Sequence, residues 1–210
     1  MAEMKFKFTI QPYQTEAVDS VVGVFAGQPF NDHFTYRRDV EIRRDVTNWM
    51  LSDEELYMGF ANAKVQLDSG QLLENIRRIQ TRNNIKLSDS LKSGGLGVCS
   101  LDVEMETGTG KTYVYIKTMF ELNKLYGWSK FIVVVPSIAI REGVRKSFET
   151  MQEHFMEYYG KKARFFVYNS KNLPDIDNYS QSADINVMII NIQAFNARGK
   201  DARRIRTELD

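Results

Sequence analysis

The sequence predicts an α/β fold in which helices cover both faces of a doubly wound parallel sheet. Two observations carry this prediction. Short stretches such as FIVVV (131–135) and NVMIIN (186–191) are apolar throughout, without the alternation of half-exposed strands, and polar stretches with helical periodicity separate them. Continuously apolar strands that alternate with helices are typical of parallel sheets that are buried on both faces.

The first 27 residues predict a short strand followed by a helix. In FKFTI (6–10), apolar residues alternate with polar ones, as in a half-buried strand. A helix is expected from about Tyr13, because the preceding proline suits an early helical position and apolar residues then recur with helical spacing. Gly27 acts as a stop signal. These elements form the first predicted segment, residues 1–27.

Residues 28–97 form the second predicted segment and are polar and mostly helical in pattern. The stretch LLENIRRIQTRNNI (72–85) has an apolar stripe at helical spacing, and SLKSGGLG (90–97) predicts a flexible loop before the next element. We expect a mainly helical insertion that packs on the following domain. Docking of a partner subunit on this insertion is the alternative.

From residue 98 onward, strands and helices alternate regularly. In chain order, the prediction is a strand at 99–105, a helix at 111–126, a strand at 131–135, a helix at 140–155, a strand at 163–168, a polar loop through Pro174 and Asp177, and a strand at 186–191. This order of elements is that of a layered α/β domain.

Composition and charge exclude some classes of protein. The chain of 210 residues has 28 Lys and Arg against 27 Asp and Glu, so any basic surface for nucleic acid must be local. Its one cysteine, Cys99, cannot form an internal disulfide, which fits the reducing cytoplasm. No apolar stretch reaches the length of a membrane span, and the N-terminus lacks the apolar core of a secretory signal. We expect a soluble cytoplasmic protein without a membrane partner.

The sequence METGTGKT (105–112) predicts a phosphate-binding loop between a strand and a helix. It ends in the Gly-Lys-Thr of the P-loop pattern, although a methionine stands where that pattern begins with glycine. Gly108 and Gly110 let backbone amides approach phosphate oxygens, and the helix N-terminus adds partial positive charge. Lys111 would act in catalysis by reaching the β- and γ-phosphates of ATP, and the Thr112 hydroxyl would bind Mg²⁺.

This loop resembles that of the superfamily 2 helicases, which commonly reads x-x-T-G-x-G-K-T. QPYQTEAV (11–18) resembles the Q motif of the same superfamily, in which a glutamine reads the adenine edge; here that residue is Gln14, with Tyr13 or an aromatic such as Phe8 near the ring. The resemblance implies a RecA-like P-loop lobe. The nucleotide-binding residues that it implies are Tyr13, Gln14, Glu106, Thr107, Gly108, Thr109, Gly110, Lys111 and Thr112.

Two further segments lie where superfamily 2 helicases contact DNA. VVVPSIAIREGV (133–144) reads as a strand, a loop and a helix start, and it occupies the place of motif Ia. There Ser137 and backbone amides would hold a DNA phosphate, and Arg141 would add charge. IQAF (192–195) follows the last strand and makes Gln193 a candidate for DNA contact. The alternative for each segment is a capped turn after a buried strand.

Several blocks from about residue 65 onward resemble the Res subunit of type III restriction–modification enzymes. Besides the insertion before the phosphate loop, they are KFIVVVPSIAIREGVRKSFE (130–149), VYNSKNL (167–173) and VMIINIQAFN (187–196). The resemblance implies an ATP-driven motor on double-stranded DNA and a nuclease domain further along the subunit. It also implies a methyltransferase (Mod) subunit that supplies sequence recognition.

Neither apolar strand, 131–135 or 186–191, ends in the Asp-Glu pair that holds Mg²⁺ opposite a phosphate loop. The sequence therefore resembles the N-terminal piece of a longer subunit, with residues 98–210 forming a motor lobe truncated before this pair. We expect the fragment to bind ATP without hydrolysing it, whereas the full subunit would be an ATP-dependent deoxyribonuclease. The alternatives are another superfamily 2 helicase, a stand-alone P-loop NTPase or kinase, and a non-enzymatic binding module.

Overall fold

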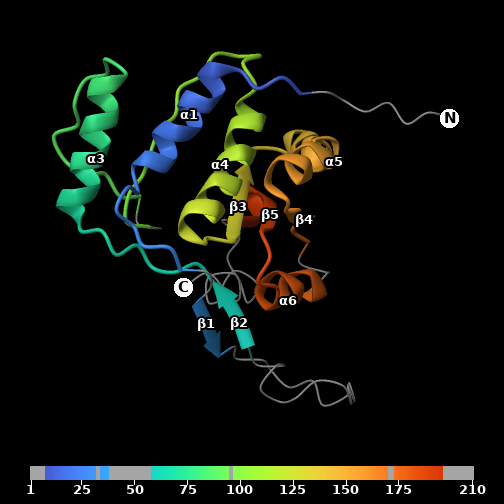
Figure 1. Cartoon of the computed structure of the whole chain (residues 1–210). Coiled ribbons are helices and arrows are strands. Elements are labelled where there is room, and N and C mark those ends of the chain that lie inside the picture. The colour runs from blue at the N-terminus through green and yellow to red at the C-terminus, as the bar shows by residue number, and fades with distance from the viewer. Residues whose placement is uncertain (1–7, 32–33, 38–57, 95–96, 170–172, 196–210) are drawn as a thin grey trace. The chain divides into compact units, whose positions relative to one another are not determined.

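The computed structural model describes residues 8–31, 34–37, 58–94, 97–169 and 173–195 (Figure 1). They form two compact units that interleave along the sequence. The first unit comprises the described residues of 1–31, 64–127 and 150–161, and the second those of 32–63, 128–149 and 162–210. Neither unit coincides with one of the three predicted segments, whose boundaries remain a prediction.

The first unit is built from helices. They are α1 (Pro12–Gly23), α3 (Ser69–Arg82), α4 (Lys111–Tyr126) and the second half of α5 (Ile138–Tyr159). Pro12 occupies the first turn of α1, and Asp68 and Gln71 form a capping box at the start of α3. Left-handed glycines, Gly110 and Gly127, lie immediately before and after α4. The helices expected from Tyr13 and over 111–126 are thus confirmed.

The core of the first unit lies between α1 and α4. Val18 and Val22 of α1 are buried, and the Tyr126 hydroxyl at the end of α4 donates a hydrogen bond of 3.1 Å to the Val22 carbonyl oxygen. Phe120, also on α4, stacks on Phe155 of α5 with ring centroids 4.9 Å apart. Burial of these side chains fixes α1 against the helix that begins at the phosphate loop.

The second unit contains a three-stranded parallel sheet. Its strands are β3 (Lys130–Val135), β4 (Arg164–Val167) and β5 (Asn186–Asn191), in the order β3-β5-β4. Lys130 and Arg164 both pair with Asn186, so the three strands start in register. The first five residues of β5 are buried, as expected for a central strand without alternation. The strands predicted at 131–135, 163–168 and 186–191 and their parallel pairing are confirmed.

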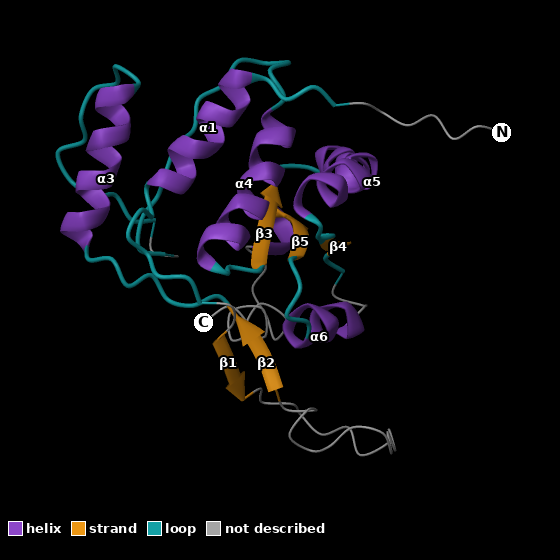
Figure 2. Cartoon of the chain, viewed as in Figure 1, coloured by secondary structure: helices purple, strands orange, loops and turns teal. Residues whose placement is uncertain are grey.

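An antiparallel pair of strands also belongs to the second unit. It pairs β1 (Phe34–Arg37) with β2 (Met58–Ala61) (Figure 2). Asn62, directly after β2, accepts hydrogen bonds of 2.8 Å from the backbone amides of Ser129 and Lys130 and donates one of 2.8 Å to the Lys130 carbonyl. The segment 28–97 therefore contributes two strands as well as α3, where we expected mainly helix.

Helices pack on the sheet of the second unit. Besides the first half of α5, they are α6 (Leu173–Gln181) and the short α7 (Ile192–Phe195). A buried cluster joins α6 to the sheet and consists of Tyr168, Ile176, Tyr179, Met188 and Ile190. Phe148 of α5 stacks on Phe165 of β4 with ring centroids 5.2 Å apart. The helix expected after Pro136 and Ser137 is confirmed in α5.

Two predictions of local structure were wrong. The polar loop expected through Pro174 and Asp177 is the helix α6, whose first turn contains the proline and an acidic residue, both favourable there. The strand expected at 99–105 has no regular structure, and Figure 2 draws it as loop. No strand within the described part of the chain pairs with this segment, and Val103 is 48% exposed, so its alternating residues lack the neighbour that a strand requires.

Of the strand expected at 6–10, residues 6 and 7 lie outside the described residues, and residues 8–10 have no regular structure. Within the described stretches, none of the helices combines the length and the apolar character needed to cross a lipid bilayer.

Candidate functional site

The phosphate loop forms a tight turn directly in front of α4. Gly108 and Gly110 have φ angles of +85° and +86°, a conformation that glycine adopts without a steric penalty. Between them, the Thr109 hydroxyl donates a hydrogen bond of 2.6 Å to the Glu106 carbonyl, which closes the turn. Because α4 begins at Lys111, the free amides of its first turn follow the glycines without an intervening residue. This geometry suits an anion.

Lys111 extends back over the loop. Its ammonium donates hydrogen bonds of 2.6 Å to the Met105 carbonyl and 2.9 Å to the Glu106 carbonyl. The side chain remains exposed, so it can exchange these acceptors for phosphate oxygens. The predicted phosphate-binding lysine therefore lies within the loop that it would serve.

Thr112 follows in the first turn of α4 and is half-buried, whereas Thr107 at the tip of the loop is exposed. The described residues contain no group of three or more His, Cys, Asp or Glu side chains that could hold a metal. The Thr112 hydroxyl would be a single protein ligand, so phosphates and water would have to supply the other ligands of Mg²⁺. This ion commonly keeps several waters and binds substrate phosphates. A nucleotide-linked Mg²⁺ is thus compatible with the loop.

Gln14 joins α1 to the phosphate loop. Its side chain is only 8% exposed, and its amide nitrogen donates a hydrogen bond of 3.0 Å to the Thr109 carbonyl. A Cβ added at Gly110 would lie 2.5 Å from that nitrogen, so the glutamine occupies the space next to the glycine. Tyr13, by contrast, is 47% exposed. Gln14 of the predicted Q motif therefore binds the loop itself, and the neighbouring Tyr13 is accessible to solvent.

Sequence reasoning missed a buried lysine that ties the same two helices together. Lys117 on α4 is 3% exposed and donates a hydrogen bond of 3.1 Å to the Thr15 hydroxyl on α1. Its ammonium also lies 5.9 Å from the centre of the Tyr158 ring. A lysine on the apolar face of the predicted helix was the signal for this contact.

The second group of predicted residues lies at the start of α5, in the second unit. The Ser137 hydroxyl accepts a hydrogen bond of 3.3 Å from the Ile140 amide and so caps the helix. The Gln193 side chain on α7 donates one of 3.4 Å to the Pro136 carbonyl. The structure thus brings Gln193 to the turn that contains Ser137, with Arg141 one helical turn further on.

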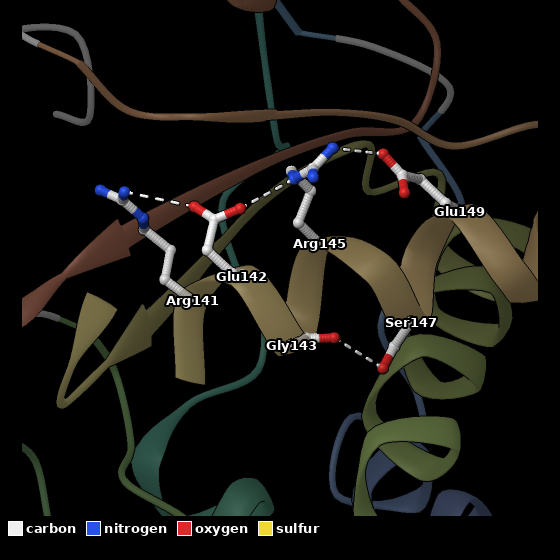
Figure 3. Close-up of polar contacts among 6 residues, drawn as sticks. All are labelled: Arg141, Glu142, Gly143, Arg145, Ser147 and Glu149. Atoms are coloured by element: carbon white, nitrogen blue, oxygen red, sulfur yellow. Dashed lines mark hydrogen bonds and ion pairs between the residues drawn. The ribbon is translucent and has the colours of Figure 1, made fainter. Parts of the chain in front are cut away.

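Arg141 differs from the next arginine of α5 in its surroundings (Figure 3). Arg145 bonds Glu142 at 3.0 Å and Glu149 at 2.5 Å, whereas the only ion pair of Arg141 with a described residue is with Glu142, at 3.3 Å. The Nε atom of Arg141 is buried without a hydrogen-bond partner among the described residues. Hydrogen bonding from Arg145, assisted by Arg141, lowers the pKa of Glu142. Arg141 therefore retains more capacity for an additional anion.

The comparisons with known proteins agree with these observations. A family model described as the type III restriction enzyme, res subunit, matches residues 73–208. The Res subunit of the EcoP15I enzyme of Escherichia coli is 30% identical over 205 residues, which cover 90% of this chain and 19% of that protein. The EcoPI Res subunit of Escherichia phage P1 is 32% identical over 162 residues, covering 76% of this chain and 14% of that protein.

A third relative, the StyLTI Res subunit of Salmonella typhimurium, is 50% identical over 62 residues. The chain thus spans a fifth or less of the length of these curated relatives. Because the family model covers more than half of its residues, the chain belongs to the type III restriction enzyme Res subunit family.

Proposed function

We propose that this chain is the ATP-binding part of the DNA-dependent ATPase and translocase in a type III restriction subunit. In this proposal it forms most of a first RecA-like lobe with a doubly wound sheet. The geometry of the phosphate loop carries the proposal: two left-handed glycines and Lys111 lie at the N-terminus of α4, and Gln14 supports them. Family membership argues against a stand-alone P-loop kinase.

Different residues of the loop would bind different parts of the nucleotide and its Mg²⁺. The amides between Gly108 and Thr112 would bind phosphate oxygens, and Lys111 would leave the Met105 and Glu106 carbonyls for the β- and γ-phosphates. The Thr112 hydroxyl would be the protein ligand of Mg²⁺. When bound, this ion neutralises charge on the phosphates.

The start of α5 would contact double-stranded DNA. Ser137 and the first amides of α5 would hold a backbone phosphate, and Arg141 and Gln193 would add a charge and a hydrogen-bond donor. Phosphate contacts position a protein on DNA without reading its sequence. We propose that a methyltransferase (Mod) partner supplies recognition and that the complete subunit cleaves foreign DNA in the cytoplasm.

This chain should bind nucleotide without hydrolysing it. Hydrolysis by such a loop requires an acidic pair that holds Mg²⁺ and orients the attacking water. None of the described strands ends in Asp-Glu: β3 ends at Val135 and β5 at Asn191. The complete enzyme would obtain these carboxylates from elsewhere in the subunit.

Equilibrium binding of ATP in the presence of Mg²⁺ tests the proposal. Lys111→Ala should weaken binding by about tenfold or more, because it removes a charged hydrogen-bond donor from the phosphates. Lys86→Ala, at an exposed lysine outside the loop, should leave the affinity unchanged. Equal affinity in the wild-type chain and Lys111→Ala would contradict the site. Turnover by the wild-type chain that disappears in Lys111→Ala would contradict the expected lack of hydrolysis.

A further inference from the structure

We propose that the Tyr115 hydroxyl positions the Thr112 hydroxyl as a ligand of nucleotide-linked Mg²⁺. This inference rests on the proposed binding of ATP, and it gives a role to a residue outside the phosphate-loop motif. Tyr115 lies on α4, three residues after Thr112. Residues at this spacing share a face of a helix, and a long helical side chain extends back towards the N-terminus. The ring of Tyr115 can therefore bring its hydroxyl to Thr112.

The Tyr115 hydroxyl is buried without a regular hydrogen-bond partner among the described residues. Burial raises the pKa of Tyr115, and an interaction with the Thr112 side chain opposes this increase to a smaller extent. The two hydroxyls are thus neighbours without a hydrogen bond of regular geometry. A buried hydroxyl in this state lowers stability, so a phenylalanine would serve a purely structural role better.

Other threonine hydroxyls near this point bond to backbone carbonyls. The Thr109 hydroxyl donates to the Glu106 carbonyl at 2.6 Å, and the Thr118 hydroxyl donates to the Val114 carbonyl at 2.8 Å. Within the described residues, no such bond holds the Thr112 hydroxyl. Thr112 therefore keeps both its proton and its lone pairs for other partners.

A hydroxyl that ligates a cation must direct its proton elsewhere. The oxygen offers a lone pair to Mg²⁺, whose octahedral geometry tolerates little displacement of a ligand. The O–H group of Thr112 then requires an acceptor other than the ion, and the Tyr115 oxygen provides one. With its proton held there, the Thr112 oxygen presents its lone pairs to the ion. Tyr115 is thus a positioning residue that acts on the ion only through Thr112.

Tyr113 provides a matched comparison on the same helix. Its hydroxyl lies 3.1 Å from the Nε2 atom of His154 on α5, and its ring stacks on Phe155 with centroids 5.4 Å apart. All three residues belong to the first unit. The Tyr113 hydroxyl therefore already has a partner, and its removal should not affect Mg²⁺.

The affinity for ATP, measured with Mg²⁺ and with EDTA in its place, tests the inference. In the wild-type chain, Mg²⁺ should increase the affinity. Tyr115→Phe should reduce this increase about fivefold, the size of one hydrogen bond, and leave the affinity in EDTA unchanged. Tyr113→Phe should retain the full increase. A purely structural defect would weaken binding with and without Mg²⁺ alike.

A double-mutant cycle with Thr112 identifies how the effect is transmitted. Thr112→Val removes the hydroxyl, so Tyr115→Phe should then change the response to Mg²⁺ no further. Thr112→Ser retains the hydroxyl, and in this background Tyr115→Phe should again reduce the response about fivefold. An undiminished effect of Tyr115→Phe in the Thr112→Val background would show that it does not act through Thr112 and would overturn the inference.

The outcomes separate this inference from the proposed function. ATP binding that depends on Lys111, together with a wild-type response to Mg²⁺ in Tyr115→Phe, would overturn the role of Tyr115 and leave the phosphate site intact. Equal losses with Mg²⁺ and with EDTA would overturn it too, as would a wild-type affinity that does not depend on Mg²⁺. Absence of Lys111-dependent ATP binding would overturn both proposals.

Discussion

The Gln14 side-chain amide donates a hydrogen bond of 3.0 Å to the Thr109 carbonyl, so the start of α1 and the phosphate loop are directly linked. The link depends on Gly110, since a Cβ there would lie 2.5 Å from the Gln14 nitrogen. Gln14 can thus act on a nucleotide through the conformation of the loop as well as through any contact of its own.

The first prediction concerns the two left-handed glycines of the loop. Gly108→Ala introduces backbone strain of about 1–2 kcal/mol and no contact, because nothing lies within 4 Å of its Cβ. Gly110→Ala introduces the same strain and also displaces Gln14. We expect it to lower the free energy of unfolding by about 1 kcal/mol more than Gly108→Ala. Urea unfolding measures both values.

The Gln14→Ala background provides the control for this comparison. If displacement of Gln14 causes the extra loss, the two glycine variants should become equally destabilising once the glutamine is absent. A difference that persists in this background would assign the extra loss to another cause.

The second prediction concerns Asn62, whose side chain hydrogen-bonds the backbone amides of Ser129 and Lys130 and the Lys130 carbonyl at the start of β3. Asn62→Ala leaves these partly buried backbone groups unsatisfied and should lower the free energy of unfolding by about 2–3 kcal/mol. Asn62→Asp retains the acceptor for the two amides, so it should lower the free energy of unfolding by less than Asn62→Ala does. Asn178→Ala, at an exposed position of α6, should change stability by less than about 0.5 kcal/mol. Equal effects of Asn62→Ala and Asn178→Ala would contradict the role of Asn62.

The third prediction concerns the pH dependence of stability. Lys130 donates hydrogen bonds to the carbonyls of Tyr179, at 2.5 Å, and Ser182. Burial lowers the pKa of Lys130 from its usual 10.5 to about 8, with Asp184 opposing and Arg164 reinforcing the change. Between these two pKa values the unfolded chain holds a proton that the folded chain has released. Stability should therefore rise with pH from about 8 towards 10.

Chemical denaturation at several pH values checks this rise. Lys130→Met should remove it, whereas Lys162→Met, at an exposed lysine of the same unit, should retain it. The useful window closes near pH 10, because burial raises the pKa of Tyr179 and the unfolded chain then loses tyrosine protons first. A Lys130→Met variant with the slope of the wild-type chain would refute the assignment.

The fourth prediction follows from the proposed contact with DNA. Arg141→Gln should weaken binding of a labelled duplex and reduce the dependence of log K on log salt concentration by about one, as expected for one lost phosphate contact. Arg145→Gln should have a smaller effect, because Glu142 and Glu149 already bind that side chain. Fluorescence anisotropy at several salt concentrations gives both quantities. A larger loss from Arg145→Gln would argue against Arg141 as the contact.

The sequence predicted those elements whose signals are local. The apolar run of β5 and the proline before Tyr13 each specify an element without reference to distant residues. The strand at 99–105 could not be judged in this way, because alternating residues form a strand only when another strand lies beside them. For α6, the sequence through Pro174 and Asp177 predicted a polar loop, although Pro174 and Asp175 are also favourable in the first turn of a helix.

The candidate site was predictable only in part, for a similar reason. Glycines and a lysine at fixed spacing identify the phosphate loop, since the whole motif is contiguous in sequence. The contact of Lys117 with Thr15 depends on how separate helices pack. Nothing in the spacing of those residues indicates which side chains will meet.

The hydrogen bonds of the Lys111 ammonium affect which anions the loop can bind. Its ammonium already has two oxygen acceptors inside the protein, so an incoming anion must compete with them. A single orthophosphate would have to replace both carbonyls with one group, whereas a chain of phosphoryl groups could replace them and engage the helix amides at the same time. If the loop binds ATP as proposed, this position of Lys111 would favour triphosphates over free phosphate.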